Sequence, residues 1–383
     1  MSDASISIPA AAGMREQLAT RIMFFVIGLA AGVWAPLVPF AKQRLGLDDG
    51  ALGLTLLSLG VGSIVAMPLA GALAARLGCR RVVIAAAAVV CLSLPLLAVA
   101  SSVPLFAAAL FAFGVGIGSL DCVINIQAIV VERDSGRAMM SGIHALYSLG
   151  GFAGAAAVSG LLALDVAAPG VVVAAAALMA LATAASAPGL LSRKAEEHAA
   201  PFAAPRGVVL LIGAFCFVVF LAEGSALDWS AVFLRTARHV ASAAAGLGYA
   251  AFAVAMTCGR LVGDRLVARL GLRRTVIAGA ALAAAGLVVA TVTPGWISTV
   301  IGYVLVGAGC SNIVPALFTA IGRQSAMPET QAVAAVSVLG YAGILAGPAA
   351  IGLVARATSL GAALLVVAAM LASVAVGATR LRV

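Results

Sequence analysis

Apolar stretches of about 20 residues recur along almost the whole chain, and this pattern leaves few folds open. A helix needs about 20 apolar residues to cross about 30 Å of hydrocarbon. Such stretches lie at residues 21–40, 51–74, 82–100, 105–131, 138–163, 170–187, 208–231, 243–267, 275–293, 296–321, 331–355 and 359–379. We therefore predict an all-α membrane protein with twelve transmembrane helices.

The composition excludes several classes of protein. Hydrophobic residues make up 63% of the 383 residues and charged residues 10%, whereas soluble domains carry about 25% charged residues. The net charge of +9 does not indicate nucleic-acid binding, because no water-soluble basic domain carries it. The six cysteines show no CxxC or Cys/His spacing, so we expect no disulfide, no metal site and no cofactor.

The lysines and arginines lie in short loops and predict the orientation of the chain. With the N-terminus inside, eighteen of them are cytoplasmic and five are not. The smaller set is Lys42, Arg44, Arg235, Arg238 and Arg356. The positive-inside rule then places both termini in the cytoplasm, and we expect the chain to reside in the inner membrane of a bacterium.

An internal repeat divides the chain into two halves. Residues 75–87 align without gaps to residues 268–280, with ten of thirteen positions identical, at an offset of 193. Six spans per half give both copies the same orientation, so the repeat axis runs along the membrane normal. We expect a tail at 1–20, a six-helix bundle at 21–187, a cytoplasmic linker at 188–207, a second bundle at 208–379 and a cytoplasmic C-terminus at 380–383.

The loop after the second span is similar to a loop motif of the major facilitator superfamily, Gly-x-x-x-Asp-Arg-x-Gly-x-Arg-Arg. It has Ala75 at the acidic position, while the second half carries Asp264 one turn earlier. The resemblance implies that this loop is a charge latch at the cytoplasmic ends, with its acid supplied by the second half. The implied gating residues are Arg76, Arg80, Arg81, Arg260, Asp264, Arg265 and Arg269. All of these arginines except Arg260 are expected to bridge toward Asp264 and Glu132.

Three further stretches, at 121–125, 140–150 and 223–231, resemble a bacterial branch of that superfamily related to fucose-type sugar permeases. The resemblance to the superfamily as a whole covers all twelve spans. It implies a secondary transporter built from two six-helix bundles, with the first, fourth, seventh and tenth spans around a central cavity. It does not identify a substrate.

Ionisable residues inside spans indicate function, because each one is costly in the membrane. Asp121 and Asn125 share one face of the fourth span, and His144 and Tyr147 lie one turn apart in the fifth. We expect Asp121 to carry a proton, Asn125 and Tyr147 to bind solute, and His144 to form a relay or gate with Asp121. For Asp121, Asn125 and His144, the alternative is a hydrogen bond that packs helices.

The seventh span carries Glu223, a candidate for proton coupling and solute binding across the cavity from Asp121. Asp228 lies five residues on, on another face unless Gly224 breaks the helix, and is a candidate gating residue. Trp34 and Asn312 are candidate solute ligands, with ordinary packing as the alternative. Arg260 and Asp264, four apart near the end of the eighth span, should pair with each other.

These observations favour proton-coupled import of a small polar solute, such as a sugar, by a monomer that alternates between two states in the bilayer. Export of drugs or metabolites in exchange for protons is the second hypothesis. A membrane receptor or enzyme is a remote third, because the sequence shows no nucleophile–base pair and no sensory domain. The ATP-binding motif Gly-x-x-x-x-Gly-Lys-[Ser/Thr] is absent from the sequence, which argues against an ATP-driven pump.

Overall fold

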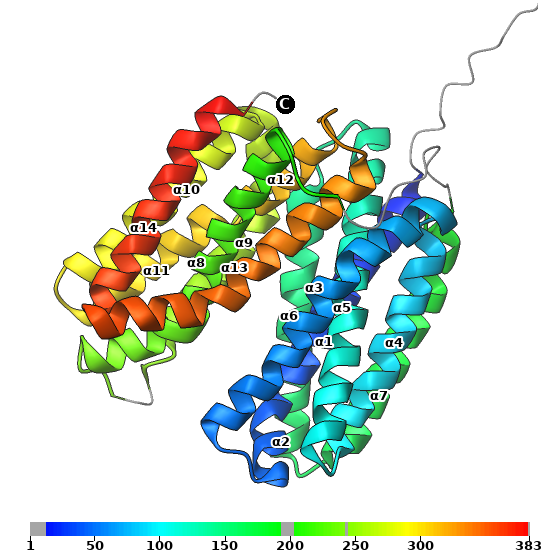
Figure 1. Cartoon of the computed structure of the whole chain (residues 1–383), viewed down its shortest axis with the longest axis horizontal. Coiled ribbons are helices and arrows are strands. Elements are labelled where there is room, and N and C mark those ends of the chain that lie inside the picture. Colours follow the sequence, from blue (N-terminus) through cyan, green and yellow to red (C-terminus); the bar gives the residue numbers. More distant parts are fainter. Residues whose placement is uncertain (1–12, 193–202, 242–243, 382–383) are drawn as a thin grey trace, which may run out of the picture.

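The computed structural model describes residues 13–192, 203–241 and 244–381, and the ordered elements in these ranges are all helices (Figure 1). Most of the predicted N-terminal tail and residues 193–202 of the predicted linker lie outside them. In the first half the elements are α1 (Met14–Trp34), η1 (Ala35–Leu37), α2 (Val38–Leu45), α3 (Asp49–Leu77), α4 (Cys79–Val99), α5 (Val103–Ser135), α6 (Met140–Ala163), α7 (Ala168–Ser186) and η2 (Ala187–Gly189).

In the second half the elements are α8 (Val208–Thr236), α9 (Leu247–Leu270), α10 (Leu272–Val292), α11 (Trp296–Cys310), α12 (Ile313–Ile321), α13 (Glu329–Ala357), α14 (Leu360–Gly377) and η4 (Ala378–Arg380). Within the described part of the chain, eleven helical stretches are long and apolar enough to cross a membrane. The helix α9, with 24 residues, is not among them because its last turns carry several charges. With α9, the predicted twelve helices are accounted for.

Two of the spans are interrupted. The first bends through η1, where Pro36 stands early in the 3-10 turn, and the tenth is divided into α11 and α12 at Ser311 and Asn312. Proline and a broken helix both remove backbone hydrogen bonds within a span, which is tolerated where neighbouring helices or a cavity supply partners.

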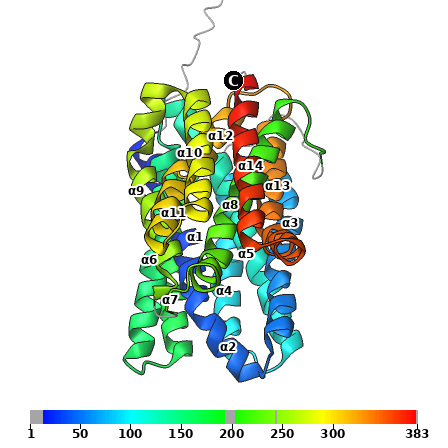
Figure 2. The same cartoon turned by 90° about the vertical axis from the view of Figure 1, so that its left-hand side faces the viewer.

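The helices form two bundles, α1–α7 and α8–α14, that approach each other at one end and diverge at the other (Figure 1). The closed end carries the start of α1 and the C-terminus (Figures 1 and 2); we call it the terminal end and the other the open end. Contacts between the bundles run mainly through α3 with α13 and α6 with α9.

Glycines related by the repeat make the same contacts in both bundles. A Cβ added at Gly114 would overlap the carbonyl oxygen of Leu59, and one at Gly307 would overlap that of Phe252. Both the glycines and their partners are separated by 193 residues. Small residues let membrane helices approach closely, so α5 packs on α3 as the α11–α12 span packs on α9. This correspondence confirms the parallel repeat.

Two arginines extend the repeat to the open end. Arg44 donates to the carbonyl oxygens of residues 97, 98 and 100 at the end of α4, at 2.5–2.9 Å. Arg238 donates to those of residues 290, 291 and 293 at the end of α10, at 2.8–3.1 Å. A cation is favourable at a helix C-terminus. This role explains why two of the five basic residues predicted outside the cytoplasm stand there.

The outer surface of the bundles is apolar. Leu92 of α4, Leu181 of α7 and Val376 of α14 are 72%, 69% and 70% exposed. These helices are the third, sixth and twelfth spans, and residues 82–100, 170–187 and 359–379 include no Asp, Glu, Lys, Arg or His. The chain is a multi-pass membrane protein.

Candidate functional site: a cavity between the two bundles

A cavity of about 580 Å³ lies between the bundles. Its walls come from α1, α5 and α6 of the first bundle and from α8, α9, α12 and α13 of the second. Six predicted site residues line it, namely Asp121, Asn125, His144, Tyr147, Glu223 and the gating candidate Arg260. The structure therefore brings together on one cavity residues that are up to 139 positions apart in the sequence.

Asp121 and Asn125 face the cavity from α5, as their spacing predicts. The Asn125 Nδ2 donates to the backbone oxygen of Asp121 at 2.9 Å and to its Oδ1 at 3.3 Å. The Asn125 Oδ1 is buried and has no hydrogen-bond partner. A buried acceptor without a partner is costly, so this oxygen is available to a donor on a bound solute.

His144 stands where both bundles meet. Its Nδ1 lies 2.9 Å from the Met140 carbonyl oxygen, and since a carbonyl can only accept, this nitrogen carries the proton. Its ring packs against Phe24 of α1 at 5.0 Å and Phe318 of α12 at 6.1 Å. No hydrogen bond joins His144 to Asp121 within the described residues, so the predicted relay is not assembled in this state.

Glu223 faces the cavity from α8, in the bundle opposite Asp121. Its Oε1 is buried and without a hydrogen-bond partner. The helix α8 runs unbroken from Val208 to Thr236, so Gly224 does not interrupt it and Asp228 stays on another face. Asp228 is exposed and is not part of the cavity wall.

Two predicted solute ligands lie outside the cavity wall. Trp34 packs inside the first bundle against Phe106 and Phe113, with ring centroids at 5.9 and 6.5 Å. Asn312 stands at the break between α11 and α12, and its Nδ2 donates to the Gly259 carbonyl oxygen at 3.0 Å. Both side chains join helices within one bundle. Their positions therefore fit ordinary packing, the alternative to solute binding given above.

Arg260 and Asp264 do not pair with each other, which corrects the prediction of an ion pair on α9. The Arg260 Nη1 donates to Ser148 Oγ of α6 at 2.8 Å, and the guanidinium lines the cavity. Asp264 accepts the backbone N–H groups of Ser141 and Gly142, also of α6, at 2.9 and 3.0 Å. The two residues do share a face of α9, but that face packs on the opposite bundle and each residue bonds there.

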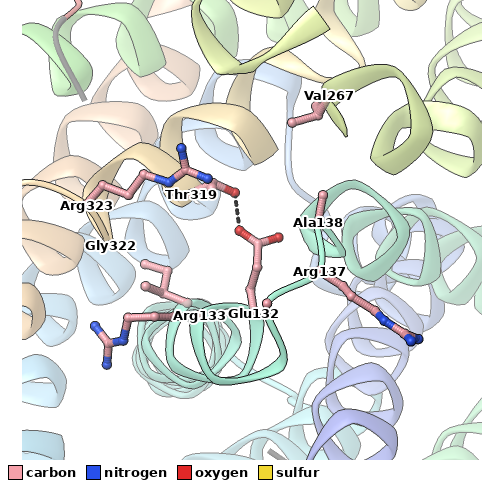
Figure 3. A pocket seen from close by; sticks show the side chains of 10 residues that line it. Glu132, Arg133, Arg137, Ala138, Val267, Thr319, Gly322 and Arg323 are labelled. Carbon is pink, nitrogen blue, oxygen red and sulfur yellow. Dashed lines mark hydrogen bonds between the residues drawn. The ribbon is translucent and has the colours of Figure 1, made fainter. Parts of the chain in front are cut away.

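The terminal end is sealed by acids that bond across the bundles. Glu132 of α5 accepts from the Thr319 hydroxyl of α12 at 2.5 Å, as Figure 3 shows, and from the backbone N–H groups of Met139 and Met140 at 2.8 Å. Arg133 of α5 pairs with Glu329 of α13 at 2.7 Å. These contacts border a second, smaller pocket of about 260 Å³ on this face.

The predicted arginine cluster is not formed. The side chains of Arg76, Arg80, Arg81, Arg265 and Arg269 are exposed, and no ion pair within the described residues involves them. The two acids named for the latch, Asp264 and Glu132, do bond across or near the interface, but their partners are backbone N–H groups and a hydroxyl. A helix N-terminus offers unpaired N–H groups and a positive dipole end. The start of α6 therefore binds these two acids in place of the predicted arginines.

Apart from Tyr147, the aromatic residues of the cavity wall were not predicted from the sequence. Tyr249, Phe252 and Tyr341 line it together with other aromatic side chains. Their distribution along apolar spans is the same as that of core aromatics, so the sequence carried no signal that separates the two.

Comparison with known proteins supports the family predicted from the loop motif. The model of the Major Facilitator Superfamily matches residues 22–233. An uncharacterised MFS-type transporter of Yersinia pestis is 50% identical over 367 residues, which cover 96% of this chain and 96% of that protein.

Solved structures agree with this assignment. The fucose:proton symporter FucP of E. coli has a TM-score of 0.79 at 17% identity, over 97% of this chain and 100% of that one. A structure of FucP in the outward conformation has a TM-score of 0.77 at 19% identity, over the same shares. These proteins are transporters and not enzymes. The chain belongs to the major facilitator superfamily.

Proposed function

We propose that this transporter moves a small polar solute, such as a sugar, across the inner membrane of a bacterium by alternating access, with protons as the coupling ion. The observation that carries the proposal is the central cavity, which holds Asp121 on one bundle and Glu223 on the other and is sealed at the terminal end. The proton coupling named for the fucose symporter, whose fold the chain shares, supports the same assignment.

The proposed orientation places the terminal end in the cytoplasm, with the domain bounds expected above. Eighteen of the 23 lysines and arginines then lie on the cytoplasmic side, in agreement with the positive-inside rule. The cavity of the present state accordingly faces outward. Exchange between this state and one open to the cytoplasm requires the contacts of Asp264, Glu132 and Arg133 to break.

Asp121 is the proposed proton carrier. A carboxyl group costs little in a dry cavity when it is protonated and several kcal/mol when it is charged. Its protonation state therefore biases which side the cavity opens to, and a differential of this kind is what coupling requires. Glu223, with an unpaired buried oxygen, is the proposed solute ligand in the second bundle, and it can share the proton.

Transport by purified protein in liposomes tests this assignment, with and without an imposed pH gradient. The Asp121→Asn variant mimics the protonated acid. It should keep solute exchange between equal pools and lose proton-driven accumulation. Glu223→Gln should weaken solute binding more than it uncouples transport.

A matched control is Asp165→Asn, which makes the same change at an exposed turn of the open end. Its φ of 59° is a conformation that asparagine tolerates, so this variant should accumulate solute like the wild type. Wild-type accumulation by Asp121→Asn would show that this carboxyl group is a packing hydrogen bond. The solute for the assay comes from a thermal-shift screen, because a ligand that binds the folded state raises its unfolding temperature.

A further inference from the structure

Arg260 places a buried positive charge on the wall of the cavity. It is the one lysine or arginine among the residues that line the cavity, and it is 6% exposed. Its partners are neutral, namely Ser148 Oγ at 2.8 Å and the Ser311 carbonyl oxygen at 3.4 Å. In the described part of the chain, no aspartate or glutamate lies within ion-pair distance of it.

The three charged groups of the cavity differ in what protons do to them. Asp121 and Glu223 become neutral when they take up protons, whereas a guanidinium does not lose its charge in proteins. In the protonated carrier, the charge left on the cavity wall is therefore the positive charge of Arg260. A buried ion needs a partner of opposite charge, and the chain itself does not supply one at contact distance.

The rest of the wall suits an apolar body better than a chain of hydroxyl groups. Of the 28 residues that line the cavity, eight are phenylalanine or tyrosine. The side-chain amides and aliphatic hydroxyls are four, on Asn125, Ser148, Thr257 and Ser337, and Ser148 is already bonded to Arg260. A polyol loses water from every hydroxyl on binding and needs a partner for each; a flat or apolar acid does not.

We propose that Arg260 is the anion-binding residue of the cavity and that the solute is a small organic acid, with a carboxylate on the guanidinium and an apolar or aromatic body against the ring-lined wall. Arginine presents a planar fork of donors that matches a carboxylate. The unpaired oxygens of Glu223 and Asn125 are left to accept from donors elsewhere on the solute. This inference rests on the proposed transport function and specifies its substrate class.

The test compares acids with their own amides, which have the same shape and lack the charge. The probes are benzoate, phenylacetate, cinnamate and indole-3-acetate, each with its amide, together with fucose as a neutral polyol and phenethylamine as a cation. Binding to purified wild-type protein is measured by thermal shift over a concentration series. At least one acid should bind about 10- to 100-fold more tightly than its amide, as a charge-assisted hydrogen bond implies.

The variants Arg260→Gln and Arg260→Lys assign that preference to the guanidinium. Arg260→Gln should abolish the preference for acid over amide, and Arg260→Lys should keep part of it. Arg273→Gln, which removes an exposed arginine of α10, should bind like the wild type. If Arg260→Gln does not fold, the acid–amide comparison on the wild type still tests whether an acid is preferred, and Arg260→Lys tests the contribution of the guanidinium.

Several results would overturn the inference. They are equal binding of every acid and its amide, tighter binding of fucose or phenethylamine than of any acid, or an unchanged preference in Arg260→Gln. Proton-driven uptake of fucose would refute the organic acid and leave the proposed function standing. Binding of an acid through Arg260 without any effect of a pH gradient on its uptake would support the organic acid and refute proton coupling in the proposed function.

Discussion

Replacing Asp264 by asparagine should release the terminal end and shift the transporter away from its present state. Asp264 of α9 accepts two backbone N–H groups at the start of α6, at 2.9 and 3.0 Å. Asparagine keeps one oxygen that can accept one of them, but it loses the charge and the second bond. Hydrogen bonds to charged groups contribute about 1.5–3 kcal/mol each, and Asp264 is half-buried.

Because partial exposure to solvent weakens these bonds, the substitution should destabilise the closed terminal end by about 1–2 kcal/mol. At about 1.4 kcal/mol per factor of ten, the ratio of the two states then shifts by about 5- to 30-fold toward opening at the terminal end. The substitution Gly142→Ala attacks the same contact from the other bundle, because its Cβ would lie 2.6 Å from Asp264 Oδ2. It should shift the ratio in the same direction and by less, since the carboxylate can turn away.

Pulsed electron spin resonance between spin labels measures this shift. One pair, on Val166 and Pro294, spans the open end, and a second pair, on Arg137 and Arg273, spans the terminal end. The exposed native Cys258 is first replaced by serine. In Asp264→Asn the first distance should shorten and the second should lengthen, while Asp165→Asn should change neither. Unchanged distributions in Asp264→Asn would refute the idea that this carboxylate holds the terminal end closed.

Three further predictions follow from the repeat and from the exposed ion pair. Gly114→Ala and Gly307→Ala should each lower the free energy of unfolding by about 1–3 kcal/mol or prevent folding, because both Cβ atoms overlap a backbone oxygen; thermal unfolding in detergent measures the loss, and wild-type values would contradict the shared packing. Arg44→Gln and Arg238→Gln should each cost about 1–2 kcal/mol in the same assay, since each leaves three helix-end carbonyls without a cation. Arg133→Gln should shift the spin-label distances far less than Asp264→Asn, because the Arg133 side chain is 53% exposed and such pairs contribute at most about 1 kcal/mol; an equal shift would show that this ion pair is the latch.

The fold was predictable from the sequence because its determinants are local. Span length follows from the thickness of the bilayer, and the repeat of Arg-Leu-Gly-x-Arg-Arg at an offset of 193 relates the two halves. The cost of an ionisable group within a span singled out Asp121 and Glu223, and the family resemblance, which implies that the fourth and seventh spans border a central cavity, placed both on one cavity. Their roles in coupling stay predictions.

The partners of the polar side chains could not be read in the same way. The spacing of Arg260 and Asp264 correctly placed them on one face of α9. It could not show that this face packs on α6, where a serine hydroxyl and a helix N-terminus are nearer than the two side chains are to each other. Trp34 is a comparable case, because helix rotation decides whether an indole faces the cavity or Phe106.

The repeat explains the shape of the cavity wall, and the sequence differences between its two halves explain which side chains the wall carries. Positions 193 apart line the cavity from opposite bundles, with Asp121 matched by Val314, Asn125 by Phe318, His144 by Ser337 and Ser148 by Tyr341. At two of these four pairs the second bundle has an apolar residue, Val314 or Phe318, where the first bundle has a polar one. A symmetric cavity would bind a solute equally in two orientations, whereas this one presents different side chains from its two bundles and can fix one orientation.

Sequence differences between the two halves also determine how each interface between the bundles is closed. Asp264 corresponds to Gly71 of α3, and a Cβ at Gly71 would lie 3.0 Å from the Thr330 carbonyl oxygen of α13. The helices α3 and α13 therefore pack too closely at this position for a carboxylate, and the contact there is one of backbone and small side chains. Between α6 and α9 the acid bonds the helix start instead. At these matched positions α3 and α13 meet by packing, whereas α9 and α6 meet through a charged group. A single substitution at Asp264 should therefore loosen the second contact and leave the first in place.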